Sequence, residues 1–207
     1  MKLDRKIVPN TNNVVNFINK KRPYEDNINF EELRSYRLNR VKRELEKQNL
    51  KACLLFDPVN IRYALDTTNM SVFNMHNLTR YCFIPVNGPT ILYEFFNCEK
   101  FSSHLHLIDE IRPAITWDYF CHGSEADSQL KKWVNKIKDN TDTYCKNMKR
   151  LAIDVINGPA VEELNKIGLL VVDAKSVVEQ ARVIKSTDEI QCLKAAIEVA
   201  EKGISKM

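Results

Sequence analysis

The sequence has few glycines and no long hydrophobic run, and each absence excludes a class of protein. Its 5 glycines among 207 residues lie far apart, so there is no glycine-rich loop to cradle a phosphate group. No apolar run reaches the roughly 18 residues that a membrane-spanning helix needs, so we expect no membrane partner. The polar, asparagine-rich start lacks the apolar core and the cleavage site of a signal peptide. The expected location is therefore the cytoplasm.

Closely spaced cysteine pairs are also missing. The 6 cysteines stand far apart, and no two form a Cys-x-x-Cys motif. Such spacing is not that of a disulfide framework or a zinc knuckle. Cys53 and Cys82 lie inside apolar, strand-like runs, where a thiol packs as a small hydrophobic group. We therefore expect reduced cysteines with a mainly structural role.

The charge of the chain is nearly balanced. The sequence has 31 basic and 27 acidic residues, and the resulting net charge of +4 is spread along the chain. Basic residues cluster only modestly, at positions 20–22 and 34–47. A nucleic-acid-binding protein would show a denser basic stripe interleaved with exposed aromatic residues. We therefore expect no nucleic-acid partner.

The hydrophobic pattern predicts three segments. Residues 1–30 are rich in Asn and Lys and show no sustained period, which is typical of a polar extension. Residues 31–175 alternate between helical and strand-like periods and form the predicted main domain. Residues 176–207 are predicted to be a linker followed by one helix.

Strands and helices alternate along the main domain. Asn87-Gly88 lies between two apolar runs and is a strong signal for a β-hairpin. Helices are expected at 31–48, 125–140 and 159–167, and strands at 51–56, 80–86, 90–96, 108–113, 151–155 and 169–173. This order predicts an α/β fold, with a mixed sheet and helices on both of its faces.

The C-terminal segment predicts a short helix at 176–184 and a capped second helix. Ser186 followed three residues later by Glu189 is the pattern of a capping box. Five apolar residues then recur at helical spacing: Ile190, Leu193, Ile197, Ala200 and Ile204. Such a face needs a partner. The partner that covers this face could be a following domain or the sheet of the same domain, and the residues favour neither interpretation.

Two stretches resemble the creatinase, prolidase and aminopeptidase P family. The first is FDPVNIRYALDTTNM, Phe56 to Met70, which resembles the segment after the family's first strand and its Asn-x-x-Tyr core. The second is ARVIKSTDEIQCLKAAI, Ala181 to Ile197, which is similar to the junction that opens the family's catalytic domain. The two stretches lie in the family's order and about 120 residues apart, which suits one domain.

Three further sequence features of the main domain are most similar to one branch of the family. They are Asn69-Met70, His76-Asn77 and the run GPTILYEF, and they resemble the bacterial dimethylsulfoniopropionate lyase branch. The polar extension before the first helix also fits that branch.

The resemblance implies that this chain is a non-catalytic N-terminal domain. The family's catalytic domain binds one or two divalent metal ions with two Asp, one His and two Glu, all downstream of the junction helix. That helix is the last element here, so we expect no catalytic residue, no metal ligand and no cofactor in this chain. Family enzymes are generally dimers in which this domain borders the partner subunit's active site. The expected partners are a second copy of the chain or the missing catalytic domain.

Substrate-facing residues are expected after the first strand and in the next loop. The resemblance points to Arg62, Tyr63, Asn60, Asp57, His76 and Arg80. A polar loop at the carboxyl end of a strand is also where open α/β sheets bind ligands. The guanidinium of Arg62 would pair with a carboxylate of the substrate, and the phenol of Tyr63 would shape the binding surface. In the structural alternative Asp57 caps a turn, Tyr63 is core and Arg62 is paired on the surface.

Two local sites compete with this interpretation. His104-x-His106 would present two imidazoles on one face of a strand, but no third metal ligand follows at a fixed spacing. Cys121-His122 suggests a thiolate pair, but neighbours on a strand point to opposite faces.

The expected function is therefore a domain that dimerises and shapes a partner's metal-dependent active site. The alternative is a stand-alone module that binds a small carboxylate through Arg62 and Tyr63. A metallohydrolase built locally from the histidines ranks last.

Overall fold

The structure is a computed structural model that describes residues 25–207. Most of the predicted polar extension, residues 1–24, lies outside the described residues. By its internal contacts the chain divides into two compact units. One unit is Glu31–Lys185, and the other contains Ser186–Met207 with the described residues before Glu31, 25–30. The predicted domain boundaries at residues 30 and 175 stay predictions.

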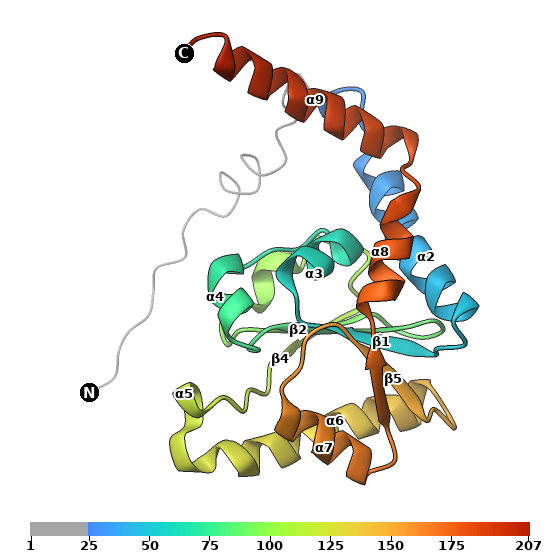
Figure 1. The fold of residues 1–207 in the computed structure, drawn as a ribbon, viewed down its shortest axis with the longest axis vertical. Helices are drawn as coiled ribbons and strands as arrows, with labels where there is room; N and C mark the ends of the chain where they lie inside the picture. The colour runs from blue at the N-terminus through green and yellow to red at the C-terminus, as the bar shows by residue number, and fades with distance from the viewer. Residues whose placement is uncertain (1–24) are drawn as a thin grey trace. The chain divides into compact units, whose positions relative to one another are not determined.

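The larger unit is built on one six-stranded mixed sheet (Figure 1). The spatial order of its strands is β4-β3-β2-β1-β5-β6. The strands are β1 (Ala52–Leu55), β2 (Tyr81–Pro85), β3 (Ile91–Glu94), β4 (Glu110–Pro113), β5 (Arg150–Ile153) and β6 (Leu170–Asp173). β2 is antiparallel to β1 and to β3, and every other neighbouring pair is parallel. The predicted mixed sheet and its hairpin are confirmed.

Helices cover both faces of the sheet (Figure 1). One face carries α2 (Phe30–Lys47), α3 (Pro58–Leu65) and α8 (Lys175–Val183), and the other carries α6 (Ala126–Tyr144) and α7 (Gly158–Lys166). Short elements lie in the connections: α4 (Ser71–His76), η2 (Glu99–Ser102), α5 (Tyr119–His122) and η3 (Gly123–Glu125). Within residues 25–207, no helix is long and apolar enough to cross a membrane.

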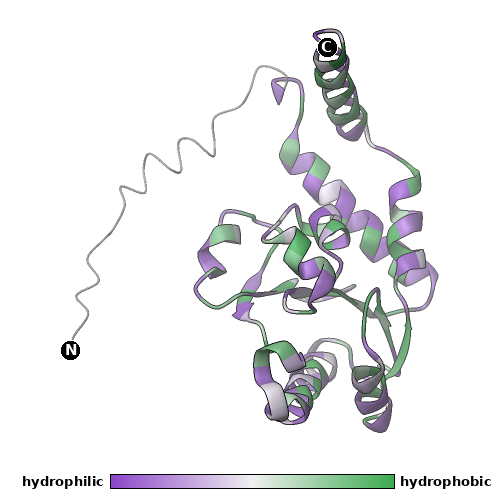
Figure 2. Ribbon diagram, turned by 60° about the vertical axis from the view of Figure 1, so that its left-hand side comes forward, coloured by the Kyte–Doolittle hydropathy of each residue, from purple (hydrophilic) through white to green (hydrophobic). Residues whose placement is uncertain are grey.

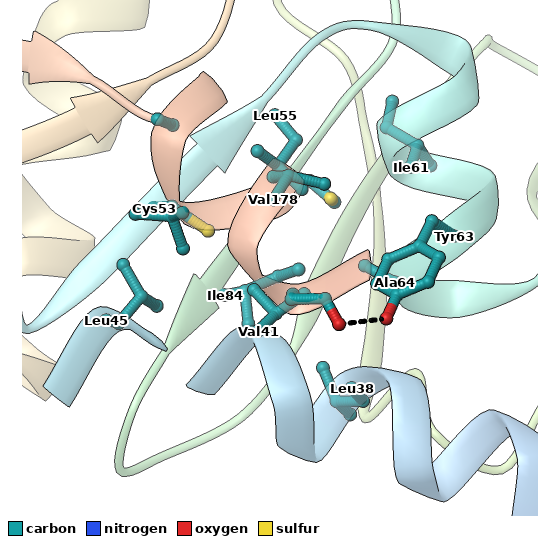
Figure 3. Packing of buried hydrophobic residues seen from close by; sticks show 14 of the residues in the cluster. Leu38, Val41, Leu45, Cys53, Leu55, Ile61, Tyr63, Ala64, Ile84 and Val178 are labelled. Carbon is teal, nitrogen blue, oxygen red and sulfur yellow. Dashed lines mark hydrogen bonds between the residues drawn. The ribbon is translucent and has the colours of Figure 1, made fainter. Parts of the chain in front are cut away.

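Alternating side chains of the strands divide the core into two layers. Cys53 and Leu55 of β1 pack toward α2 and α8, where Val41 and Val178 are fully buried (Figure 3). Leu54, between them, packs into the layer under α6 and α7. Both faces are thus apolar, which explains why the strands read as short continuous hydrophobic runs.

Aromatic rings fill the layer under α6. The rings of Trp117 and Trp133 lie 4.2 Å apart between centroids, and Phe56 meets Trp117 edge-on at 5.8 Å. Tyr81 stacks on Tyr93 at 4.6 Å. Tilted and edge-on pairs of this kind add to the free energy gained from area burial. The apolar face of α6 is buried in this layer, with Leu130, Trp133, Val134 and Ile137.

The smaller unit contains α9 (Thr187–Ile204). The backbone N–H of Glu189 donates to Ser186 Oγ at 3.2 Å, and that of Ser186 donates to Glu189 Oε2 at 3.0 Å. The predicted capping box is therefore confirmed. Hydrophobic residues run along the helix (Figure 2), and Ile190, Leu193, Ile197 and Ile204 are between 43% and 71% exposed.

The cysteines are expected to react with a thiol reagent in a fixed order. All six lie in the described residues and form no disulfide. Burial raises the pKa of the Cys53 and Cys82 thiols well above the ordinary value, and that of Cys145 to about 11. Because the thiolate is the reactive form, Ellman's reagent should modify exposed Cys121 first. The three buried thiols should react only on denaturation.

Cys121→Ser provides the control for this order. The substitution should remove the fastest step of absorbance change and leave the steps that require denaturation unchanged. Rapid modification of Cys53 or Cys82 in native protein, located by peptide mapping, would contradict the packing of the core.

Candidate functional site at the carboxyl edge of the sheet

The carboxyl ends of the parallel strands lie at one edge of the sheet, and antiparallel β2 begins there. We call the connections at this end the carboxyl edge, defined as residues 56–80, 95–102, 114–123 and 154–157. Figure 1 shows α4 and α5 at this end, on opposite sides of the sheet. Open α/β sheets bind ligands at this end of their strands.

The chain leaves neighbouring strands β1 and β5 toward opposite faces. α3 follows β1 on the α2 side, and α7 follows β5 on the α6 side. A reversal of this kind between adjacent parallel strands is a topological switch point. Asp154, the first residue after β5, lies at this switch point and is 6% exposed.

The carboxylate of Asp154 ties the two connections together. It accepts hydrogen bonds from the backbone of Phe56 (2.8 Å), Asp57 (3.2 Å) and Val155 (2.7 Å), and from Asn60 Nδ2 (2.9 Å). Burial raises the pKa of Asp154, and the four donors oppose this rise. The sequence analysis missed this residue. The available signal was its position, since Asp154 follows a short apolar run just as Asp57 does.

Asp57 begins α3. Its side chain accepts from the backbone N–H of Val59 at 2.7 Å and of Asn60 at 3.0 Å, and Pro58 occupies the first turn. Asp as N-cap followed by Pro is a strong helix start. The predicted polar loop after the first strand is therefore wrong, because these residues form a helix. Of the two predicted roles for Asp57, the structure shows the cap.

Tyr63 and Asn60 face α8. Tyr63 is 9% exposed, and its hydroxyl donates to the carbonyl of Ala181 at 2.9 Å (Figure 3). The guanidinium of Arg182 lies 5.0 Å from the centre of the Tyr63 ring and donates to Asn60 Oδ1 at 2.8 Å. A cation over an aromatic face is attractive. Both residues therefore hold α3 against α8.

Arg62 and His76 point outward from the carboxyl edge. Arg62 is exposed on α3, and its side chain has no hydrogen bond or ion pair with any residue from 25 to 207. His76 is exposed at the end of α4. These two of the six predicted site residues can meet a ligand without a change in the fold.

Arg80 lies beneath the surface in a buried ion pair. Its Nε donates to Glu94 Oε2 at 2.8 Å, and the two side chains are 1% and 0% exposed. Its Nη2 donates to Thr67 Oγ1 at 2.7 Å. Asn69 Nδ2 donates to the other carboxylate oxygen of Glu94 at 3.1 Å. Among the described residues, Arg80 Nη1 has no hydrogen-bond partner. The pair links the start of β2, the end of β3 and the loop before α4.

The loop above this pair has an unusual backbone conformation. Met70 has φ +40° and ψ +50° and caps α4 without a side-chain hydrogen bond. A long side chain in the left-handed region costs on the order of 1 kcal/mol and is maintained only by its surroundings. The side chain of Met70 is 53% exposed. The fold thus holds an apolar side chain outward at this edge.

Exposed apolar side chains concentrate at the carboxyl edge. In the unit Glu31–Lys185, nine large exposed hydrophobic residues belong to it: Val59, Met70, Val72, Met75, Phe96, Phe101, Tyr119, Phe120 and Val155. Three lie elsewhere in that unit: Leu170, Val183 and Ile184. Concentrations of exposed apolar groups mark interaction surfaces.

The described residues do not fit a metal centre. From residue 25 onward, no group of three or more His, Cys, Asp or Glu side chains is placed to hold a metal ion. His104 and His106 lie in irregular turns and not on the alternating strand that a metal site built from them would need. Cys121 and His122 lie on α5 and not on a strand, and His122 Nε2 shares a 2.7 Å hydrogen bond with Thr116 Oγ1.

Comparisons with known proteins give two curated relatives. The sequence is similar to dimethylsulfoniopropionate lyase DddP from Roseobacter denitrificans, with 29% identity over 175 residues. It is 28% identical to the lyase of the same name from Roseovarius nubinhibens over 175 residues. Each match covers 84% of this chain and 39% of the relative. The chain thus spans about two fifths of the length of these relatives. No protein-family model matches.

Solved structures show the same fold. A prolidase from Thermococcus sibiricus matches with a TM-score of 0.61 and 19% identity, over 84% of this chain and 43% of that one. A Xaa-Pro dipeptidase from Bacillus anthracis matches with a TM-score of 0.57 and 14% identity, over 83% and 42%. The resemblance seen in the sequence is confirmed at the level of the fold: the chain has the fold found in these prolidase and Xaa-Pro dipeptidase structures, and it is similar in sequence to the two dimethylsulfoniopropionate lyases.

Proposed function

We propose that this chain is the non-catalytic domain of a metal-dependent enzyme of the prolidase and dimethylsulfoniopropionate lyase type. In this proposal the domain pairs with a second copy and places its carboxyl edge beside an active site built by other residues. The supporting observation is the concentration of exposed apolar side chains at that edge, nine against three elsewhere in the same unit. Exposed apolar surface of this kind is stabilised when a partner covers it.

We assign the proposed role in substrate binding to Arg62 and, after it, to His76, which is also exposed at the carboxyl edge. The names of the similar proteins describe carboxylate-bearing compounds, a propionate and Xaa-Pro dipeptides. A guanidinium binds a carboxylate through two parallel hydrogen bonds. Asp57, Asn60, Tyr63 and Arg80 then act by holding this surface in place. The proposal assigns the metal ions to the catalytic residues of the enzyme and none to this chain.

Self-association tests the proposed pairing. Sedimentation velocity of the purified chain should show a concentration-dependent dimer. The double variant Val72→Glu/Phe96→Glu should weaken it by at least about tenfold, because two charges would be buried at the interface. Leu170→Glu is the matched control, since Leu170 is exposed on β6 at the other end of the sheet and should leave the dimer unchanged. A chain that stays monomeric at high concentration would contradict the pairing.

Metal content and activity test the non-catalytic assignment separately. The purified chain should cleave neither dimethylsulfoniopropionate nor Xaa-Pro dipeptides, and elemental analysis should find no stoichiometric metal. Tight, stoichiometric binding of iron, manganese or zinc would overturn the assignment, whatever the oligomeric state.

The guanidinium of Arg62, which has no hydrogen bond or ion pair with residues 25–207, also supports a second candidate, a stand-alone module that binds small carboxylates. Tyr63, the expected companion, is buried against α8, so the candidate rests on Arg62. Calorimetric titration of the chain with a propionate or a dipeptide would show saturable binding that Arg62→Met abolishes. If neither ligand gives a measurable heat of binding, the second candidate is rejected and only the first proposal remains.

A further inference from the structure

The amino edge of the sheet, opposite the candidate site, carries a chemically reactive turn. β2 and β3 are joined there by a hairpin whose tip is Asn87-Gly88, and both residues are exposed. Gly88 has φ +120°, a conformation that glycine adopts without strain. The side chain of Asn87 and the backbone N–H of Gly88 have no hydrogen-bond partner among residues 25–207. Both reacting groups are therefore accessible and unrestrained by hydrogen bonds.

We propose that Asn87 is a site of spontaneous covalent modification by intramolecular deamidation. The deprotonated backbone nitrogen of Gly88 attacks Cγ of Asn87, the bond from Cγ to Nδ2 breaks, and ammonia leaves. The resulting five-membered cyclic imide then takes up one water molecule, which opens either of its two C–N bonds. The products are aspartate and isoaspartate at position 87, and no oxidant, metal or enzyme is required. Glycine permits this attack because it has no side chain to block the ring closure.

A second Asn-Gly pair in the same chain is protected by the fold. Asn157-Gly158 begins α7, and Asn157 has φ −90° and ψ 160° as its N-cap. The side-chain oxygen of Asn157 accepts from the backbone N–H of Ala160 at 3.2 Å and from Trp117 Nε1 at 3.3 Å. These two bonds hold the amide toward the helix. The amide carbon therefore cannot turn onto the nitrogen of Gly158 while the protein is folded.

The surroundings of Asn87 can accommodate the new charge. Asn87 lines a hollow of about 620 Å³ between the hairpin and the ends of α2 and α6, which also includes Lys51 and Lys146. Glu46 lines the same hollow, so a carboxylate formed here would share it with two cations and one anion, and the net positive charge offsets its proximity to the helix C-termini. The isoaspartate product also lengthens the hairpin backbone by one carbon, beside Tyr144, whose side chain a Cβ added at Gly88 would meet at 3.4 Å.

Peptide mapping by mass spectrometry tests this proposal with the chain's own internal control. The folded chain is incubated in mildly alkaline buffer beside a sample unfolded in guanidinium chloride. In the folded sample we expect loss of most of the Asn87 amide while Asn157 stays intact. In the unfolded sample both positions should convert. Conversion of Asn157 as fast as Asn87 in folded protein, or conversion of neither, would overturn the proposal.

Asn87→Gln provides the matched variant. Its longer side chain would have to close a six-membered ring, which is much slower, while its polarity is unchanged. Labelling of the folded protein by isoaspartyl methyltransferase should be present in the aged parent chain and lost in aged Asn87→Gln. Equal labelling of the two aged proteins would place the reactive asparagine elsewhere and reject Asn87.

Discussion

Replacing Arg80 by methionine is expected to lower the free energy of unfolding by about 3–5 kcal/mol, because the carboxylate of Glu94 would remain buried without its cation. Glu94 is 0% exposed and would keep only neutral donors, Asn69 Nδ2 and the backbone N–H of Phe95. Unfolding in urea, followed by tryptophan fluorescence, measures the change. Trp117 and Trp133 lie in the buried aromatic layer, so their fluorescence changes when this layer unfolds.

Two further variants separate the buried ion pair from a general effect of losing an arginine. Arg62→Met removes an exposed guanidinium and should change the free energy of unfolding by no more than about 0.5 kcal/mol. The double variant Arg80→Met/Glu94→Leu removes both charges and should recover most of the lost stability, since a well-packed apolar pair can replace a buried ion pair. If Arg80→Met lowers the free energy of unfolding as little as Arg62→Met does, the buried ion pair of Arg80 does not stabilise the carboxyl edge.

Replacing Asp154 by asparagine is expected to cost roughly 2–4 kcal/mol, because buried N–H donors would lose an acceptor. The amide has one oxygen where the carboxylate has two, and its NH₂ would face the donors of Asp57 and Asn60. Chemical denaturation measures the loss. Asp173→Asn is the control, since Asp173 ends β6 and, among residues 25–207, its side chain accepts only one exposed backbone hydrogen bond, from Lys175.

The cost of Asp154→Asn should also depend on pH. Burial raises the pKa of Asp154 in the folded chain, so the folded carboxyl group binds its proton more tightly than the unfolded one, whose pKa is about 3.9. Its contribution to stability is fully present below the unfolded pKa and is lost as pH rises through the folded pKa. The stability difference between parent and variant should therefore shrink from acid toward neutral pH. A difference that grows with pH would show that the four donors outweigh burial.

Hydrophobic periodicity predicted most of the fold. α2, α6 and α9 each have 18 or 19 residues, long enough to show a repeating apolar face. The strands appear as continuous apolar runs because both faces of the sheet are covered. Helices α3 and α4 have only 8 and 6 residues, too few turns for a period to emerge. The start signal Asp57-Pro58 was present, but Asp57 was interpreted as the cap of a turn and not as the start of a helix.

The roles of the candidate site residues depended on contacts that local patterns do not contain. In the sequence Arg80 looks like a surface arginine, because its partner Glu94 is 14 residues further along the chain. The fold of the sheet brings the two side chains together. Asp154 acquires its role from Phe56, 98 residues away. The first contact follows from the antiparallel pairing of β2 with β3, and the second from the strand order, in which β5 lies next to β1. The outward position of Arg62 agrees with the role expected from the resemblance, although its contact with a substrate stays a proposal.

The distant pairing of β1 with β5 has a consequence for how the chain folds. The β2–β3 hairpin closes over a few residues, whereas the Asp154 contact closes a loop of 98. Long loops lose more chain entropy on closure, and distant pairings slow folding. The Asp154 contact at the carboxyl edge is therefore completed late, after the hairpin and the helices have begun to form. A nascent chain still lacking β5 has the arginine and aromatic side chains of the edge but not the carboxylate that fixes the start of α3.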